Sequence, residues 1–346
     1  DAVVGIAKND DIVEIINSVM LDRRVVTFGD KLCHNMEGDK LQSTLPHYAY
    51  LRIADGCSNK CSYCAIPLIR GKMRSRKMEN IIEEAKKFAE NGVKELVIVA
   101  QDVTAYGIDL YKKYALPDLL KELCKIDGIK WIRLLYCYPE RMTDELIETI
   151  KTEDKVLNYI DIPIQHCNKE ILRNMYRGGD EQSLRELFAK LRREIPGVVL
   201  RTTLITGFPG ETEEQFSELA EFVNDIKFER LGCFAYSAEE DTPAAEMPDQ
   251  VDEGERQRRA DIITSEQEIR MGEYYAGMVG NTYEVVCEGF DRYSDMYFGR
   301  SMHFAPEIDG MIYFTSAKDK SSLTIGDFVN VKITDVLENN LLGERV

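Results

Sequence analysis

Three cysteines lie close together in the first fifth of the chain. Cys57, Cys61 and Cys64 follow the spacing C-x3-C-x2-C. Thiolates at this spacing can bind three irons of a 4Fe–4S cube, whereas a closed ferredoxin cluster takes a fourth cysteine. The next cysteine is Cys124, sixty residues beyond Cys64. The motif therefore predicts a 4Fe–4S cluster in which one iron stays open for a ligand that the protein does not supply.

A zinc site and an electron-transfer cluster are the alternatives to this interpretation. Structural zinc prefers four ligands in paired spacing, but the first histidine after the motif is His166 and the sequence has no second C-x2-C pair. An electron-transfer cluster would need a fourth cysteine ligand. The later cysteines are scattered among apolar residues, and we expect buried, unreactive thiols at Cys124, Cys137, Cys167, Cys233 and Cys287.

Composition and charge restrict the class of protein and partner. The 346 residues are 44% hydrophobic and 30% charged, which excludes a wholly disordered chain. The net charge of −17 repels nucleic-acid phosphates unless a local basic patch exists, and it favours basic partners. Apolar runs are too short to cross a membrane, and the first residues contain no signal-peptide core. We expect a cytoplasmic protein with no membrane partner.

The elements that position the motif alternate along the chain. Short apolar segments rich in Val, Ile, Leu and Tyr predict strands at 50–54, 95–100, 131–136, 159–163, 198–206 and 230–236. Helical patterns lie between and after them, at 78–91, 117–125, 143–151, 168–176, 181–194 and 212–227. This alternation predicts an α/β fold with a parallel sheet, either a partial (βα)6 TIM-like barrel or an open doubly wound sheet. Active sites collect at the carboxyl ends of the strands in both folds, and the cysteine motif follows the first strand.

The flanks of this region have different patterns. Residues 1–20 read as a strand and a helix, which we interpret as the C-terminal remnant of an N-terminal α/β domain, followed by a linker over 21–47. A helix is expected over 254–272. From Tyr283 short strands separated by glycine turns predict a small OB-like β-barrel. The expected domains are therefore 1–20, 21–47, 48–280 and 281–346.

The cysteine motif resembles the signature of the radical S-adenosylmethionine (SAM) superfamily. Other segments resemble its methylthiotransferase branch, namely Ala65-Ile-Pro-Leu-Ile-Arg-Gly71, Gln101-Asp102, Asp161-Ile-Pro-Ile-Gln-His166 and Arg201-Thr-Thr-Leu-Ile-Thr-Gly-Phe-Pro-Gly-Glu-Thr212. The C-terminal module resembles a TRAM domain. Two further segments look most like the RimO-type ribosomal-protein methylthiotransferases, Tyr236-Ser-Ala-Glu-Glu-Asp-Thr-Pro-Ala-Ala245 and Ala305-Pro-Glu-Ile-Asp-Gly310. In the first of these, tRNA-modifying relatives tend to have a basic-proline version where Glu239 and Glu240 stand here.

The resemblance implies an activity and its cofactors. In the superfamily the amino and carboxylate groups of SAM chelate the open iron, and an electron from the cluster cleaves SAM to methionine and a 5′-deoxyadenosyl radical. RimO-type members add a methylthio group to the β-carbon of an aspartate in small-subunit ribosomal protein twelve. The branch also carries a second 4Fe–4S cluster on its N-terminal domain, whose ligands we expect upstream of Asp1. An external electron donor is implied as well.

The resemblance also implies roles for individual residues. Cys57, Cys61 and Cys64 would hold the radical-generating cluster and are the expected catalytic and metal-binding residues. Tyr63 stands where the superfamily places an aromatic side chain near the adenine of SAM. Gln101 and Asp102 follow the second strand, where the superfamily contacts the SAM amino group. A helix cap or a turn is the structural alternative for this pair.

Further candidates come from later strands. Gln165, together with His166, ends the fourth strand and could touch SAM or the substrate, although a lone histidine is more often structural. Arg201 and Thr203 lie on the fifth strand, where the arginine could hold the SAM carboxylate. An ion pair inside the barrel is the alternative for Arg201.

The charge of the C-terminal module bears on the partner. Residues 281–346 contain eleven acidic and six basic residues, a net charge of −5. An RNA-binding module of this kind should be basic. The negative charge therefore favours a basic ribosomal protein over tRNA as the partner. The basic run from Lys60 to Lys77 could still hold RNA or be a solvated face. A tRNA adenosine methylthiotransferase, acting on N6-isopentenyl or threonylcarbamoyl adenosine, is therefore the alternative function.

Overall fold

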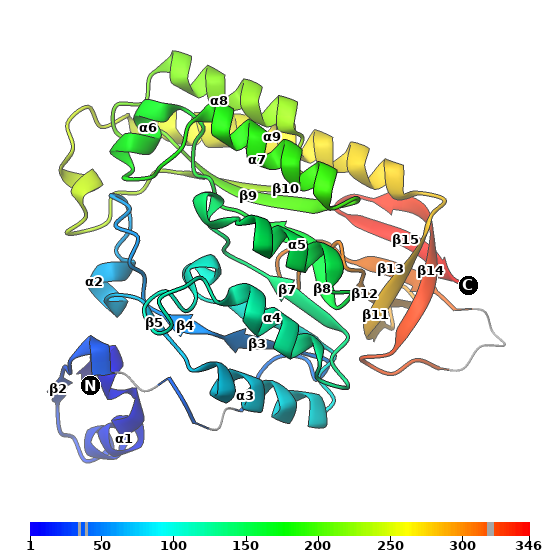
Figure 1. Ribbon diagram of the computed structural model, residues 1–346, viewed down its shortest axis with the longest axis horizontal. Coiled ribbons are helices and arrows are strands. Elements are labelled where there is room, and N and C mark those ends of the chain that lie inside the picture. Colours follow the sequence, from blue (N-terminus) through cyan, green and yellow to red (C-terminus); the bar gives the residue numbers. More distant parts are fainter. Residues whose placement is uncertain (34–35, 39–40, 317–321) are drawn as a thin grey trace.

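The computed structural model describes residues 1–33, 36–38, 41–316 and 322–346. Its largest unit is a sheet of six parallel strands in the order β10-β9-β8-β7-β6-β3 (Figure 1). The strands are β3 (Tyr48–Arg52), β6 (Glu95–Val99), β7 (Trp131–Leu134), β8 (Val156–Asp161), β9 (Val199–Thr206) and β10 (Arg230–Ala235). The partial (βα)6 barrel predicted from the alternation is confirmed.

Helices follow these strands in sequence and cover the outer face of the sheet (Figure 1). Each begins within two residues of the predicted start, because the apolar spacing and the polar capping residues are local signals. The helices are α3 (Met78–Glu90), α4 (Leu116–Cys124), α5 (Asp144–Thr152), α6 (Lys169–Asn174), α7 (Glu181–Glu194), α8 (Glu213–Ile226) and α9 (Glu253–Met278). No helix in the described ranges is both long enough and apolar enough for a membrane crossing.

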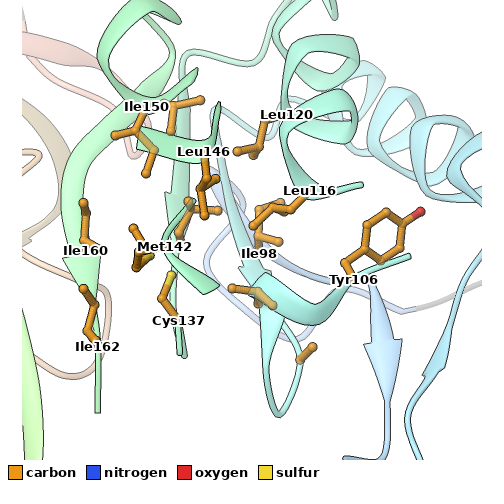
Figure 2. Packing of buried hydrophobic residues seen from close by; sticks show 14 of the residues in the cluster. Ile98, Tyr106, Leu116, Leu120, Cys137, Met142, Leu146, Ile150, Ile160 and Ile162 are labelled. Carbon is orange, nitrogen blue, oxygen red and sulfur yellow. The ribbon is translucent and has the colours of Figure 1, made fainter. Parts of the chain in front are cut away.

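Side-chain alternation along the strands divides the apolar interior into two layers. Outward residues such as Leu51, Ile98 and Leu200 are fully buried against the helices. Figure 2 shows this layer where side chains of β6 and β8 meet those of α4 and α5. The inward residues, which include Tyr48 and Tyr159, form a separate cluster inside the barrel.

The C-terminal module is a closed five-stranded barrel in the order β11-β12-β13-β15-β14, as the glycine-punctuated pattern predicted. Its strands are β11 (Thr282–Asp291), β12 (Met296–Arg300), β13 (Ile312–Thr315), β14 (Phe328–Leu337) and β15 (Asn340–Arg345). The long helix α9 leads into it and contributes Tyr275 and Met278 to its core.

The loop 301–310 of this module enters the six-stranded barrel at the amino ends of the strands. Arg133 on β7 donates a 2.9 Å hydrogen bond to the Met302 carbonyl. The Tyr48 hydroxyl donates to Glu307 at 2.7 Å, and the Tyr159 hydroxyl donates to Asp309 at 2.8 Å. The module therefore fills the end of the barrel opposite the cysteine motif.

The N-terminal segment differs in part from its prediction. β1 (Ala2–Val4), η1 (Ile6–Asp11) and α1 (Ile12–Met20) confirm a strand and a helix. The segment expected to be a linker contains β2 (Val25–Thr27), which pairs in parallel with β1, and η2 (Lys31–Cys33). The linker interpretation is wrong for 25–27, because three residues are too few to show strand periodicity and the pairing partner is distant in sequence. Residues 34–35 and 39–40 of that range lie outside the described residues.

Candidate active site

The cysteine loop begins directly after β4 (Ala54–Asp55), which pairs with β5 (Arg74–Ser75). Gly56 makes this entry possible, since its φ is +73° and a Cβ there would lie 2.5 Å from the Lys72 carbonyl oxygen. Asp55 is fully buried and accepts from Arg70 at 2.9 Å. The loop is thus anchored by an ion pair and by a position that only glycine occupies without strain.

Hydrogen bonds from neighbouring elements fix the loop between its cysteines. The backbone N–H and the hydroxyl of Ser62 donate to the carbonyls of Met175 and Asn174, at 3.1 and 2.7 Å. The Cys64 N–H donates to the Cys61 carbonyl at 3.1 Å, and the short helix α2 (Ile66–Arg70) follows. The loop that carries the three sulfurs is therefore fixed against the C-terminal end of α6.

All three cysteines line one cavity of about 510 Å³ at the carboxyl ends of the barrel strands. Cys57 and Cys64 are partly exposed and Cys61 is buried, and none forms a disulfide. Burial raises the pKa of the Cys57 thiol to about 11 and also raises the pKa of Cys64. Both are therefore neutral thiols near pH 7 in the metal-free protein, and ligation would release their protons.

The geometry bears on which metal centre these cysteines can hold. No group of three or more His, Cys, Asp or Glu side chains in the described part of the chain converges on a single ion position. A mononuclear zinc site requires such convergence. A 4Fe–4S cube does not, because each thiolate binds a different iron. Four free thiols line the cavity, the three of the motif and Cys137, and the three of the motif therefore fit the cluster better than zinc.

The structure brings most of the predicted cofactor contacts to this cavity. Tyr63, Gln101, Gln165 and Thr203 all line it. The Gln101 side-chain oxygen is buried and accepts no hydrogen bond in the described structure, which is uncommon for a buried acceptor. The N–H of an amino group is a donor that would satisfy it. The site therefore fits a cofactor that carries an amino group.

Asp102 does not line this cavity, although it is adjacent to Gln101 in sequence. Its buried carboxylate accepts from the Thr104 hydroxyl at 2.5 Å and the Ala105 N–H at 3.2 Å, and so caps η3 (Val103–Ala105). It also accepts from Asn59 at 2.8 Å and from Arg141 at 2.5 Å. The structure thus shows the capping alternative, and the carboxylate is occupied within the protein.

Arg201 is likewise placed away from the cavity lining. It lies one inward position below Thr203 on β9, and its guanidinium is 2.7 Å from the Asp161 carboxylate. The structure therefore shows Arg201 in an ion pair inside the barrel, which was the alternative to a contact with the SAM carboxylate.

His166 is also structural in this arrangement. It is fully buried, its Nδ1 accepts from the Asn168 N–H at 2.9 Å, and its Nε2 lies 3.5 Å from Glu211. Burial acts to raise the pKa of Glu211, but His166, the Gly207 N–H and Arg259 lower it by more. The histidine therefore supports the turn that precedes α8.

Two cavity residues have backbone conformations that are rare for their residue types. Tyr136 has φ +63° and Gln165 has φ +71°. The Tyr136 N–H donates to Asp161 at 3.0 Å, and Gln165 exchanges backbone hydrogen bonds of 2.9 Å with Thr203 and Ile205. Strained residues held by such networks are concentrated at functional sites, which supports the assignment of this cavity.

Sequence reasoning missed several residues of the cavity wall. Arg177 donates to the Pro163 carbonyl at 2.7 Å and to the Tyr63 hydroxyl at 3.4 Å, and it lies 4.2 Å from the Tyr138 ring centroid. Arg52 and Cys137 line the cavity as well. Cys137 was expected to be a buried thiol, and it is buried, with its pKa raised well above the ordinary value by desolvation. The signal for Arg52 in the sequence was its alternation with Tyr48 and Tyr50 along the first strand, which places the three on one face.

Comparison with known proteins agrees with this site. Residues 51–223 match the family model of the radical SAM superfamily, and residues 279–346 match that of the TRAM domain. A "Ribosomal protein uS12 methylthiotransferase RimO" from Caldanaerobacter subterraneus subsp. tengcongensis is 48% identical over 99% of this chain and 78% of its own length. The protein of that name from Clostridium botulinum (strain Hall) is 47% identical, over 99% and 76%.

The chain belongs to the RimO-type radical SAM methylthiotransferases.

Solved structures share the fold of this RimO-type chain. The radical SAM methyltransferase TsrM from Kitasatospora setae, with tryptophan and a SAM analogue bound, aligns with a TM-score of 0.54 at 14% identity, over 70% of this chain and 52% of TsrM. Coproporphyrinogen III oxidase (HemN) from Escherichia coli aligns with a TM-score of 0.50 at 18% identity, over 66% and 54%. Membership of the superfamily assigns an iron–sulfur cluster and SAM to the chain as cofactors, and the cavity fits both.

Proposed function

We propose that this chain transfers a methylthio group to the β-carbon of an aspartate in ribosomal protein uS12. The observation that carries the proposal is the group of three free cysteines on one cavity, in a chain 48% identical to a protein of that named activity. When bound, the cluster and SAM supply the carbon radical that can remove hydrogen from an unactivated C–H bond.

The chain's own residues have separable tasks in this proposal. Cys57, Cys61 and Cys64 would hold three irons. Gln101 would accept a hydrogen bond from the SAM amino group, and Tyr63 would line the adenine side. Arg177 holds that tyrosine in place by its contacts with Tyr63 and Tyr138. The aromatic wall keeps water away from the reacting carbon.

Gln165 and Thr203 complete the proposed SAM contacts, because both line the same cavity. Asp102 and Arg201 have their partners inside the protein, and we propose that they act on the site indirectly, as supports of its backbone.

The sulfur source lies outside these residues. The sequence contains no second trio of cysteines at ligand spacing. We propose that the ligands of the second cluster are not among these 346 residues, and that an external protein donates electrons.

The charges support a basic protein partner over tRNA. Within the basic run, Arg70 and Arg74 pair with Asp55, and Arg76 is buried against Glu84 at 2.7 Å. These three arginines are therefore not available to phosphates. The C-terminal module has a net charge of −5, which suits a basic ribosomal protein.

The test compares the two substrate classes directly. Full-length protein, reconstituted anaerobically with iron and sulfide, is incubated with SAM, a reductant and either uS12 or bulk tRNA. Mass spectrometry should show a methylthio group on the uS12 aspartate and none on tRNA. Modification of tRNA alone would establish the alternative function and refute this one.

A further inference from the structure

Arg52 occupies a distinctive place in the cavity. It is the last residue of β3, and the alternation along that strand directs Tyr48, Tyr50 and Arg52 inward while Ala49 and Leu51 pack in the outer core. Arg52 is partly buried and lines the same cavity as the three cysteines. Its backbone is fixed, because its carbonyl accepts from Arg76 at 2.7 Å.

Among the described residues, the guanidinium of Arg52 has no anionic partner. Across 1–33, 36–38, 41–316 and 322–346, no carboxylate lies within 4.0 Å of it and no hydrogen bond from it is formed. The other arginine of the cavity, Arg177, is satisfied by a carbonyl and two tyrosines. The nearby Arg141 and Arg201 are paired with aspartates. Arg52 is thus the cation of this wall that remains available to a ligand.

We propose that Arg52 binds the side-chain carboxylate of the target aspartate. A guanidinium binds a carboxylate through two parallel hydrogen bonds and so fixes its orientation as well as its position. The reacting β-carbon is bonded directly to that carboxylate. Arg52 would therefore place the C–H bond relative to the cysteine side of the cavity and select aspartate over neutral side chains. This inference rests on the function proposed above.

The cavity could receive a carboxylate from two sources, the target aspartate or the methionyl group of SAM. The exposure of the cavity favours the aspartate. Tyr136, which lines the same cavity as Arg52, is 46% exposed, so the cavity is open to solvent and to a polypeptide. Gln101, by contrast, offers its buried oxygen to an amino group of the cofactor.

The experiment is a double-mutant cycle that combines two forms of the enzyme with two peptide substrates. Reconstituted wild type and Arg52→Gln are each assayed on a uS12 peptide with the natural aspartate and on the same peptide with asparagine there. We expect the substitution to lower kcat/KM for the aspartate peptide roughly 10- to 100-fold, the range for loss of a charged hydrogen bond. The ratio of aspartate to asparagine turnover should fall toward one. Arg52→Lys, which keeps the charge without the two-pronged geometry, should recover part of that ratio.

Binding and cofactor measurements separate the possible outcomes. Fluorescence anisotropy of the labelled peptides on the reconstituted proteins should show the same loss of preference, and the surface variant Arg193→Gln should behave as wild type. An Arg52→Gln enzyme that keeps the aspartate preference but binds SAM more weakly would assign Arg52 to the cofactor carboxylate and overturn the inference. Failure of the wild type to modify the aspartate peptide would refute the proposed function itself, and the inference with it.

Discussion

The Arg300 guanidinium at the end of β12 lies 2.8 Å from the Glu95 carboxylate at the start of β6. Both side chains are almost fully buried, and Glu95 also accepts from Arg133 at 2.7 Å. Arg300 continues the network to Glu288, which lies 3.0 Å from His47. The C-terminal module is therefore joined to the catalytic barrel by buried charges as well as by apolar packing.

Replacing Glu95 with glutamine should weaken this junction strongly. The substitution leaves Arg133 and Arg300 buried without their shared anion, and breaking a buried pair in this way costs about 3–5 kcal/mol. Urea unfolding should show that loss in the free energy of unfolding. Glu284→Gln removes a surface pair with Lys130 and is the matched control, with an expected change of at most about 1 kcal/mol. Equal stability of the two variants would contradict the role of the buried network.

The same carboxylate should make stability depend on pH in the acid range. Burial acts to raise the pKa of Glu95, but Arg300 and Arg133 together lower it from 4.5 to about 2. Because the folded pKa is below the unfolded one, the contribution is complete above about pH 4.5 and is lost as the pH falls toward 2. The stability difference between wild type and Glu95→Gln should therefore narrow over this window. If the free energies of unfolding of wild type and Glu95→Gln differ by the same amount across this pH range, the Glu95 carboxylate does not change its protonation state on folding.

Alanine at Cys57, Cys61 or Cys64 should each abolish stable cluster binding. Every one of these thiolates holds a different iron in the proposed site, so none can replace another. Iron content and the visible absorption of the reconstituted protein measure the loss. Cys137→Ala tests the fourth thiol of the cavity and should retain the iron, because that side chain packs in the apolar core. Loss of the cluster in that variant would indicate a fourth protein ligand and an electron-transfer centre.

Gln101→Leu should weaken SAM binding without loss of the cluster. The substitution removes the unpaired buried acceptor that we assign to the SAM amino group, and an ordinary hydrogen bond contributes about 0.5–1.5 kcal/mol, or roughly two- to tenfold in affinity. Isothermal titration on the reconstituted protein gives the dissociation constant. Gln182→Leu on the surface of α7 is the control. If the affinity for SAM is unchanged, Gln101 does not bind the SAM amino group.

The sequence was informative where structure depends on local pattern. Strand and helix positions followed from periodicity, and the cysteine spacing located the site. Gln101 and Asp102 show the limit, since a shared motif cannot tell that one side chain lines the cavity while the next caps η3. Strand β2 was missed because its partner β1 is remote and both are short. Arg177 was missed because only folding brings the segment after α6 against Tyr63 and Tyr138.

The loop 301–310 has a consequence for how the protein handles a large partner. Its contacts with Tyr48, Arg133 and Tyr159 make the C-terminal barrel continuous with the interior of the catalytic one. A ribosomal protein bound to the C-terminal barrel would consequently be held at a fixed distance from the three cysteine sulfurs. In such an arrangement, that distance determines which residue of the partner can enter the cavity and be modified.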